Sequence, residues 1–357
     1  MNSTSVTAAI EPRLTSLSHG GGCGCKIAPG VLANLLKTAI PFAVPPELLV
    51  GTETADDAAV YQINEHQALI ATTDFFMPIV DNPRHFGQIA ATNAISDIYA
   101  MGGTPLMALA IVGMPINVLP HEDIAEILDG GREVCAKAGI PVAGGHSIDS
   151  VEPIYGLAVI GIIDPKNLKK NATAKAGDVL VLGKPLGVGI YSAALKKEKL
   201  DAAVYEQMIA NTTKLNTPGK KLASISGVHA MTDVTGFGLL GHALEICKGS
   251  NVQGQINYAD LKILPGVKNL AQQGFVTGAS NRNWASYGAD IELSANLTTV
   301  DQAILTDPQT SGGLLVACDP SVLNQVMQIF AEEGFGDATV VGQLSNQPNQ
   351  STFLKVI

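Results

Sequence analysis

Apolar residues recur along the chain in two rhythms, short runs that favour strands and longer stretches with helical spacing. Strand-like runs lie at residues 57–63 and 68–73, and the first of them alternates between apolar and polar positions. A helical stretch follows over 84–101 and is stopped by Gly102 and Gly103. The first part of the chain therefore predicts alternating sheet and helix.

The pattern continues with apolar strands at 106–112 and 159–163. Between them we expect a helix over 121–137 and a glycine turn at 143–147. A short helix with Pro at its first turn is expected over 29–37.

Residues 164–178 are rich in Lys, Asn and Ala and follow an apolar strand, which marks a domain boundary. Their lysines are expected on a solvated linker face. Beyond the boundary the pattern restarts with a strand at 179–183, helices through residue 221, and a turn at 232–238 that leads into a helix. Patterning alone thus predicts an α/β protein with two domains.

Composition supports this division and excludes several classes of protein. The chain has 357 residues, of which 46% are hydrophobic and 15% charged, so two packed domains are expected rather than disorder. A net charge of −10 disfavours nucleic acid and anionic membranes as partners. An anionic substrate would then arrive with its own Mg²⁺, held by carboxylates.

The sequence shows no pattern of a membrane or secretory signal, which predicts a cytosolic protein. The longest apolar runs reach about half of the roughly 20 residues that span a bilayer. Residues 1–12 have no basic and apolar leader pattern, and we interpret them as an extension rather than a secretory signal. We therefore expect a cytoplasmic protein.

The five cysteines divide into two groups. There is no Cys-x-x-Cys pair, which argues against a disulfide framework or a structural zinc site. Cys135, Cys247 and Cys318 lie in apolar surroundings and are predicted to be buried hydrophobes. Cys23 and Cys25 have no apolar neighbours, so a different role is open to them.

The segment from His19 to Lys26 places two thiols and a cation on one Gly-rich loop, which we expect to be loose. It is not a phosphate-binding P-loop, because Lys26 precedes Ile27 rather than Ser or Thr. Lys26 could still neutralise a transferring phosphoryl group, and Cys23 would be a competent thiolate if Lys26 lowers its pKa. The alternative is an incidental Gly-rich tail.

Several aspartates follow Thr or Ser residues and could hold a metal. Asp56 and Asp57 are adjacent, so on a strand only one of them can face a ligand. Asp97 lies near the negative C-terminal end of a predicted helix, where a cation would offset an unfavourable carboxylate, and Asn93 shares its helix face. The alternative for each of these acids is an ordinary surface position.

Asp233 lies in a Thr- and Gly-rich turn before a predicted helix, where an anion with its metal or a simple turn aspartate would both fit. Asp307 precedes a proline and is interpreted as an ordinary turn residue. Residues 236–241 match G-x-G-x-x-G, but no apolar strand leads directly into the match, so an oxidoreductase is disfavoured.

Seven ordered motifs carry a more specific signal. They are SHGGGCGCK at 18–26, GTETADDAAV at 51–60, TTDFFMPIVD at 72–81, ATNAISD at 91–97, AGGHSI at 143–148, MTDVTGFGLLGH at 231–242 and DPQTSGG at 307–313. In these motifs the chain resembles the selenophosphate synthetase family, the selenide, water dikinases, over residues 13–342.

This resemblance implies the two-domain fold of the aminoimidazole-ribonucleotide-synthetase superfamily, an α/β domain and an α+β domain with mixed sheets. It divides the chain into a flexible Gly- and Cys-rich segment at 1–26, an N-terminal ATP- and Mg-binding and dimerisation domain at 27–165, and a C-terminal domain at 166–357. The implied partners are ATP, selenide and a second copy that shares the nucleotide site, and a selenium-delivery protein is a further candidate.

The implied activity is synthesis of selenophosphate from selenide, ATP and water, with release of AMP and orthophosphate. More than one Mg²⁺ ion is implied as cofactor. Two alternatives stay open, another ATP-using enzyme of the superfamily and a non-catalytic selenium carrier or nucleotide sensor.

The resemblance also assigns residues to roles. Cys23 takes the catalytic thiol position and Lys26 the phosphate-facing cation. The implied metal ligands are Asp57, Asp97 and Asp233. The implied nucleotide contacts are Lys26, Thr54, Ala55, Asp56, Asp74 and Asp97, with Gly145, His146 and Ser147 reaching the nucleotide of the partner subunit.

Overall fold

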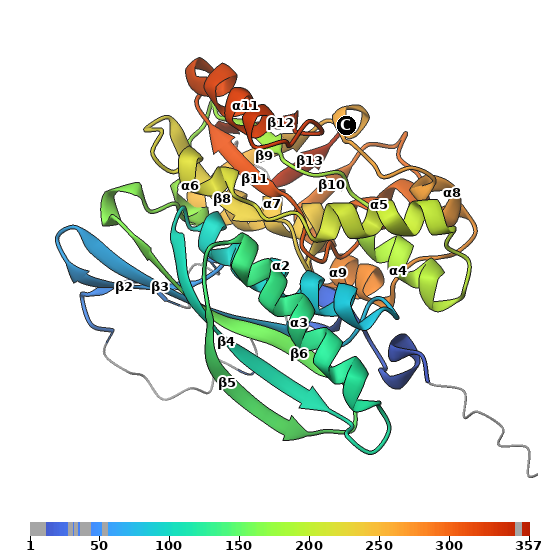
Figure 1. The fold of residues 1–357 in the computed structure, drawn as a ribbon. Coiled ribbons are helices and arrows are strands. Elements are labelled where there is room, and N and C mark those ends of the chain that lie inside the picture. The colour runs from blue at the N-terminus through green and yellow to red at the C-terminus, as the bar shows by residue number, and fades with distance from the viewer. Residues whose placement is uncertain (1–11, 28–30, 32–34, 36–43, 52–55, 347–351) are drawn as a thin grey trace, which may run out of the picture.

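The computed structural model describes residues 12–27, 31, 35, 44–51, 56–346 and 352–357, and it contains two sheets with helices packed on them (Figure 1). The first sheet has the strand order β1-β2-β3-β6-β4-β5. Its strands are β1 (Leu48–Val50), β2 (Ala59–Asn64), β3 (Gln67–Phe76), β4 (Thr104–Met114), β5 (Val142–Asp149) and β6 (Ile154–Ile163).

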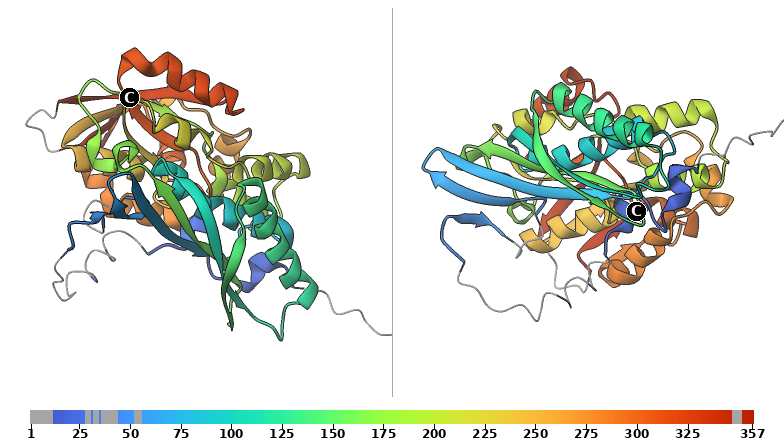
Figure 2. Two further views of the ribbon diagram at one scale, coloured as in Figure 1. Left: turned by 60° about the vertical axis from the view of Figure 1, so that its left-hand side comes forward. Right: turned by 60° about the horizontal axis from the view of Figure 1, so that its bottom comes forward.

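Helices α2 (Pro83–Ala100) and α3 (His121–Lys137) cover one face of this sheet (Figures 1 and 2). The α2 helix begins where the Asn82 side chain accepts a hydrogen bond from the His85 N–H, with Pro83 at its first position. Between Phe86 and Ala100 nearly every α2 residue is buried. A helix that is buried on all sides packs against more than one layer.

The second sheet has the order β10-β13-β9-β12-β7-β11-β8 and forms the upper part of the molecule in Figure 1. Its strands are β7 (Val179–Leu182), β8 (Val228–Asp233), β9 (Val252–Ile256), β10 (Ile291–Leu293), β11 (Leu314–Cys318), β12 (Thr339–Asn346) and β13 (Leu354–Val356). The helices in this part are α4 (Val188–Lys196), α5 (Ala202–Thr212), α6 (Pro218–Leu222), α7 (Gly238–Ser250), α8 (Val267–Gln272), α9 (Gly278–Tyr287), α10 (Thr299–Leu305) and α11 (Leu323–Glu332).

The two parts meet along α2, which contacts β8, α5 and α6 of the second part as well as its own sheet. Strand β8 is the edge strand of the second sheet and ends at Asp233. Polar groups on α2 can therefore face the end of β8 across the boundary between the two parts.

Most predicted elements are observed, and α3 has the predicted bounds. The glycine turn expected at 143–147 is wrong, because these residues belong to strand β5, parallel to β4. Gly145 is required for close approach within this pair, since a Cβ there would lie 2.1 Å from the Ala110 carbonyl oxygen. The glycines thus permit tight strand pairing rather than a turn.

The solvated face expected for the lysines of 164–178 is also wrong in part. The Lys169 side chain is buried, and its Nζ donates to the Val228 carbonyl oxygen at 2.7 Å. Lys170 Nζ donates to the Leu49 carbonyl oxygen at 2.7 Å. These long side chains reach backbone acceptors in both parts of the molecule, which pattern analysis of the linker alone does not show.

The helix expected over 29–37 lies almost wholly outside the described residues. Within the described part of the chain, each helix is too short or too polar to cross a membrane.

Candidate active site

Three of the predicted acids converge where the two parts of the molecule meet. Asp57 lies just before β2, Asp97 lies on α2, and Asp233 ends β8. One carboxylate oxygen from each lies within 4.8 Å of the others. Two widely separated stretches of sequence thus form one acidic cluster.

The cluster leaves buried oxygens without protein partners. Within the described residues, Asp57 Oδ2 makes no hydrogen bond, and the buried carboxylate of Asp233 has at most the Ser96 hydroxyl as a hydrogen-bond partner. Burial, followed by repulsion from Asp233, raises the pKa of Asp57 and of Asp97 well above the usual range. Burial also raises the pKa of Asp233. Unpaired buried carboxylates are costly unless a cation neutralises them.

Two threonines orient the cluster and were not predicted as site residues. The Thr232 hydroxyl donates to Asp57 Oδ1 at 2.9 Å, and the Thr72 hydroxyl donates to Asp97 Oδ2 at 2.5 Å. Thr232 directly precedes Asp233 at the end of β8, and Thr72 begins the Thr72-Thr73-Asp74 motif within β3. That repeated pairing was the available sequence signal.

The donor set fits Mg²⁺. All the converging ligand atoms are carboxylate oxygens, which are the ligands that hard divalent cations prefer. A zinc site would be expected to include Cys or His ligands. Asp57, Asp97 and Asp233 are therefore the residues that would hold the metal.

The Gly-rich loop is packed over this site in the structure. A short 3-10 turn, η1 (Leu14–Leu17), precedes the loop, and a second, η2 (Gly22–Cys25), lies within it. The exposed fraction of Cys23 is only 1%. Its backbone N–H donates to Thr310 Oγ1 at 3.1 Å, so the C-terminal part of the chain covers it.

The condition set for a Cys23 thiolate, a pKa lowered overall by Lys26, is not met in this arrangement. Burial raises the pKa of Cys23 well above its ordinary value, Asp74 adds to the rise, and Lys26 opposes it only in part. The buried environment of Cys23 therefore favours the protonated thiol over the thiolate.

Lys26 pairs with a fourth acid, Asp74 on β3. Lys26 Nζ lies 3.2 Å from Asp74 Oδ2, and the Asn93 amide donates to the same oxygen at 2.6 Å. Desolvation would lower the pKa of Lys26, but Asp74 and the other acids hold it above its ordinary value. Lys26 thus presents a positive charge beside the acidic cluster.

The remaining predicted acids have structural contacts. Asp56 Oδ1 accepts a hydrogen bond from the Asn171 N–H at 2.6 Å, so this carboxylate faces the linker while Asp57 faces the cluster. Thr54 and Ala55 lie outside the described residues. The interpretation of Asp307 as an ordinary turn residue is wrong, because it is fully buried and accepts hydrogen bonds from the first N–H groups of α4, on Gly189 and Ile190.

The structure separates Gly145, His146 and Ser147 from the cluster within one chain. Asp74 lies in one row with Leu157 of β6, Ala110 of β4 and Gly145 of β5. Three strand spacings place Gly145 about 14 Å from Asp74. The three residues are exposed on the edge strand, so their role at a partner's nucleotide stays a prediction.

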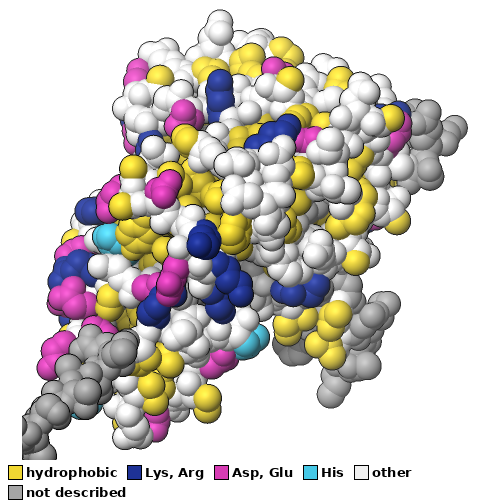
Figure 3. All heavy atoms as spheres, turned by 90° about the vertical axis from the view of Figure 1, so that its right-hand side faces the viewer, with side chains coloured by type: hydrophobic (Ala, Val, Ile, Leu, Met, Phe, Trp, Pro, Cys, Tyr) yellow, Lys and Arg dark blue, Asp and Glu magenta, His cyan; other side chains and the backbone are white. Residues whose placement is uncertain are grey.

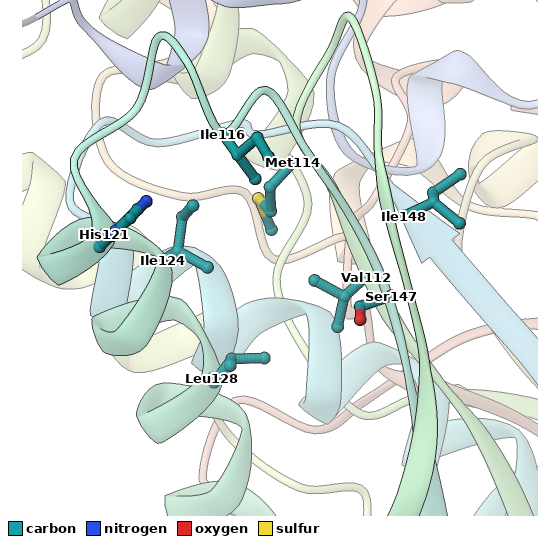
Figure 4. Close-up of a pocket in the computed structure, with 8 residues that line it drawn as sticks. All are labelled: Val112, Met114, Ile116, His121, Ile124, Leu128, Ser147 and Ile148. Carbon is teal, nitrogen blue, oxygen red and sulfur yellow. The ribbon is translucent and has the colours of Figure 1, made fainter.

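Two cavities of the described structure are lined by none of the three acids. One, of about 360 Å³, lies between α3 and the strands β4 and β5, and Figure 4 shows Ser147 there among apolar side chains such as Val112 and Leu128. The other, of about 300 Å³, lies outside the Gly-rich loop of residues 19–26, called the thiol loop below. It is lined in part by Lys196, Lys197 and Arg282. Figure 3 shows Lys and Arg side chains gathered in the middle of one face, a local exception to the acidic net charge.

Comparison with known proteins assigns the chain to a family. Residues 55–163 match the AIR synthase related protein N-terminal domain, and residues 175–355 match the corresponding C-terminal domain. The chain is 65% identical over 350 residues to a selenide, water dikinase of Burkholderia ambifaria, covering 98% of this chain and 99% of that protein. The chain belongs to the selenide, water dikinase family.

Another member of the family, from Pseudomonas straminea, is 67% identical over 347 residues, which cover 96% of this chain and 97% of that protein. Among solved structures, the AaThiL complex with AMPPCP and TMP has a TM-score of 0.64 at 18% identity, covering 98% of this chain and 96% of that chain. This second likeness shows the shared two-domain α/β fold.

Proposed function

We propose that the protein uses ATP to convert selenide and water into selenophosphate, AMP and orthophosphate. Relatives that carry the name selenide, water dikinase match nearly the whole chain. The single observation that carries the proposal is the closed thiol loop, which sets Cys23 and Lys26 over three converging carboxylates.

The chemistry divides into two steps. Selenide attacks the γ-phosphorus of ATP, a phosphorus–selenium bond forms, and the bond to the β-phosphate oxygen breaks to leave ADP. Water then cleaves the bound ADP between its α- and β-phosphorus atoms, giving AMP and orthophosphate.

The residues of the site contribute position and charge. Asp57, Asp97 and Asp233 would hold Mg²⁺, which supplies positive charge to the phosphoryl oxygens when bound. Lys26 adds a donor to the transferring phosphoryl group. Cys23 lies in the closing loop, which excludes bulk water from the first step.

Phosphorus NMR of a reaction with ATP, Mg²⁺ and selenide tests the proposal directly. We expect a species with a phosphorus–selenium bond, together with AMP and orthophosphate. Cys23→Ser should abolish selenide-dependent turnover and keep nucleotide binding. The matched control is Cys25→Ser, which changes the neighbouring thiol, whose hydrogen is donated to the Gly22 carbonyl oxygen. ADP as the final product, or stoichiometric binding without turnover, would contradict the proposal.

We further propose that two copies associate through the N-terminal domain and share the nucleotide site. The first sheet exposes apolar side chains on the face opposite α2, among them Tyr61, Phe75 and Leu109. Exposed apolar patches mark association surfaces. Analytical ultracentrifugation should give a dimer, and Phe75→Glu should give a monomer, while a monomeric wild type would exclude this assembly.

A further inference from the structure

The side chain of Asn93, fully buried on α2, has an orientation that its neighbours fix. Its Nδ2 donates to Asp74 Oδ2 at 2.6 Å, and its Oδ1 accepts from the Ser311 N–H at 2.7 Å. An ionised carboxylate can only accept and a backbone N–H can only donate, so the two ends of the amide cannot be exchanged.

The third contact of this amide is with the thiol. Cys23 Sγ lies 3.1 Å from Asn93 Oδ1, the oxygen that Ser311 already identifies as an acceptor. The sulfur must therefore donate its hydrogen. A sulfur without a hydrogen, whether ionised or bonded to a further atom, would set its lone pair against a lone pair of the amide oxygen, and the two would repel each other.

We propose that Asn93 is a positioning residue that keeps the thiol loop closed only while Cys23 carries a hydrogen. When the sulfur cannot donate, the contact is lost and the loop is released from the carboxylate cluster. The inference deepens the proposed function, because it rests on Cys23 being the thiol that acts in the reaction.

The charges around the sulfur also favour a neutral thiol while the loop is closed. Cys23 faces Asp74 from β3 and Asp233 from β8, and Lys26 and Cys25 from its own loop. Negative charge on the sulfur would be repelled by both acids and attracted by Lys26 alone. Burial, which removes the solvent that would stabilise a thiolate, is the largest cause that raises the pKa of Cys23, so the closed loop and the neutral thiol favour one another.

Other bonds of the closed loop report on its release. The Gly22 N–H donates to the Met77 carbonyl oxygen at 2.8 Å, and the Cys23 N–H donates to Thr310 Oγ1 at 3.1 Å. Both amides are protected from hydrogen exchange while the loop is closed. Peptides covering residues 19–26 therefore measure closure without any measurement of activity.

Hydrogen–deuterium exchange of the full chain, read by mass spectrometry, tests the proposal with two Cys23 variants. Cys23→Ser keeps a hydrogen donor and should exchange at 19–26 like the wild type. Cys23→Ala has no donor and should exchange about three- to tenfold faster, as expected for one lost hydrogen bond. Equal protection in these two variants would overturn the proposal.

Asn93→Leu provides the second arm. It should speed exchange at 19–26 at least as much as Cys23→Ala does, because it also removes the contacts of Asn93 with Asp74 and Ser311. Adding Cys23→Ala to Asn93→Leu should change nothing more, because the Cys23–Asn93 hydrogen bond is already lost. Additive effects would overturn the proposal. Thr92→Val is the matched control, since Thr92 is equally buried on α2 but its hydroxyl donates to Gln88 O of the same helix.

The two hypotheses fail in different ways. If Cys23→Ser kept full selenide-dependent turnover, the proposed role of Cys23 in the reaction would fall while the exchange result could stand. If the exchange of Cys23→Ser and Cys23→Ala were the same and only turnover were lost, the closure mechanism would fall and the proposed function would stand.

Discussion

At the scale of single residues, the site depends on carboxylates that are unfavourable by themselves. Asp97 illustrates this, because burial and the nearby Asp233 raise its pKa well above the usual range. Its position at the C-terminal end of α2 adds the unfavourable field of the helix dipole. A bound cation offsets the burial of the carboxylate, its repulsion from Asp233 and the field of the helix dipole. This explains why such a residue occurs inside a packed helix.

Asp97→Ala should weaken Mg-dependent binding of a non-hydrolysable ATP analogue by at least about tenfold, or about 1.4 kcal/mol. The reason is the loss of one of three carboxylates that converge within 4.8 Å. Isothermal titration calorimetry with and without Mg²⁺ measures the effect. Asp129→Ala, on the exposed side of α3, is the control, and unchanged affinity in Asp97→Ala would refute the metal assignment.

At the scale of elements, glycines bring α2 and α3 into close contact. A Cβ on Gly87 would lie 1.9 Å from the Ile127 carbonyl oxygen, and one on Gly130 would lie 2.1 Å from the Arg84 carbonyl oxygen. Since α2 carries Asn93 and Asp97, the separation of these two helices also fixes the position of the site.

Gly87→Ala should therefore lower the free energy of unfolding by about 1–3 kcal/mol, despite the better helix propensity of alanine. Urea denaturation followed by circular dichroism measures it. Gly278→Ala in α9 is the control, because its Cβ would meet only the flexible end of Arg282, at 3.3 Å. A destabilised control with an unaffected Gly87→Ala would contradict the packing argument.

The start of α10 should make stability depend on acid pH. Thr298 and Asp301 form a capping box, and Lys268 pairs with the same carboxylate. Burial would raise the pKa of Asp301, but these partners and Tyr258 lower it far below the ordinary value of 3.8. Its stabilising effect is therefore complete above about pH 4 and is lost as the pH falls further.

Asp301→Asn should cost about 1 kcal/mol at pH 7. The difference from the wild type should shrink between pH 4 and pH 2, because the Asp301 carboxyl of the unfolded wild-type chain is protonated there while the folded one is not, which favours unfolding. Denaturation curves at pH 7 and pH 3 test both statements. A difference that stays constant down to pH 2 would show that the carboxylate charge does not matter.

At the scale of the whole molecule, the acidic cluster joins the two parts. Asp57 and Asp97 come from the part that holds the first sheet, and Asp233 comes from an edge strand of the second. A cation held by all three would link the parts, and any ligand that binds only the folded state raises its stability.

Mg²⁺ with an ATP analogue should accordingly raise Tm in the wild type, by an amount equivalent to about 2.7 kcal/mol at 100 times Kd, and EDTA should reverse the rise. Asp233→Asn should raise Tm without metal, because it removes a buried charge from a repulsive cluster, and should abolish the shift. Differential scanning fluorimetry measures both. A lower Tm in metal-free Asp233→Asn would contradict the account of the cluster as strained.

The sequence by itself determined most elements, because helix bounds are local patterns, and its resemblance to the family indicated the three residues of the acidic cluster. It also indicated that Cys23 and Lys26 share one loop. It misassigned residues 143–147 and Asp307, since a strand beside β4 and a carboxylate at the start of α4 depend on partners far along the chain.

Only the tertiary structure decided that Cys23 is closed over the cluster as a neutral thiol, and that Asn93 and Thr310 hold it there. Residues 23 and 310 are 287 positions apart, and no local spacing predicts such a hydrogen bond. Burial, which sets the pKa of the thiol and of the three acids, likewise exists only once both parts have packed.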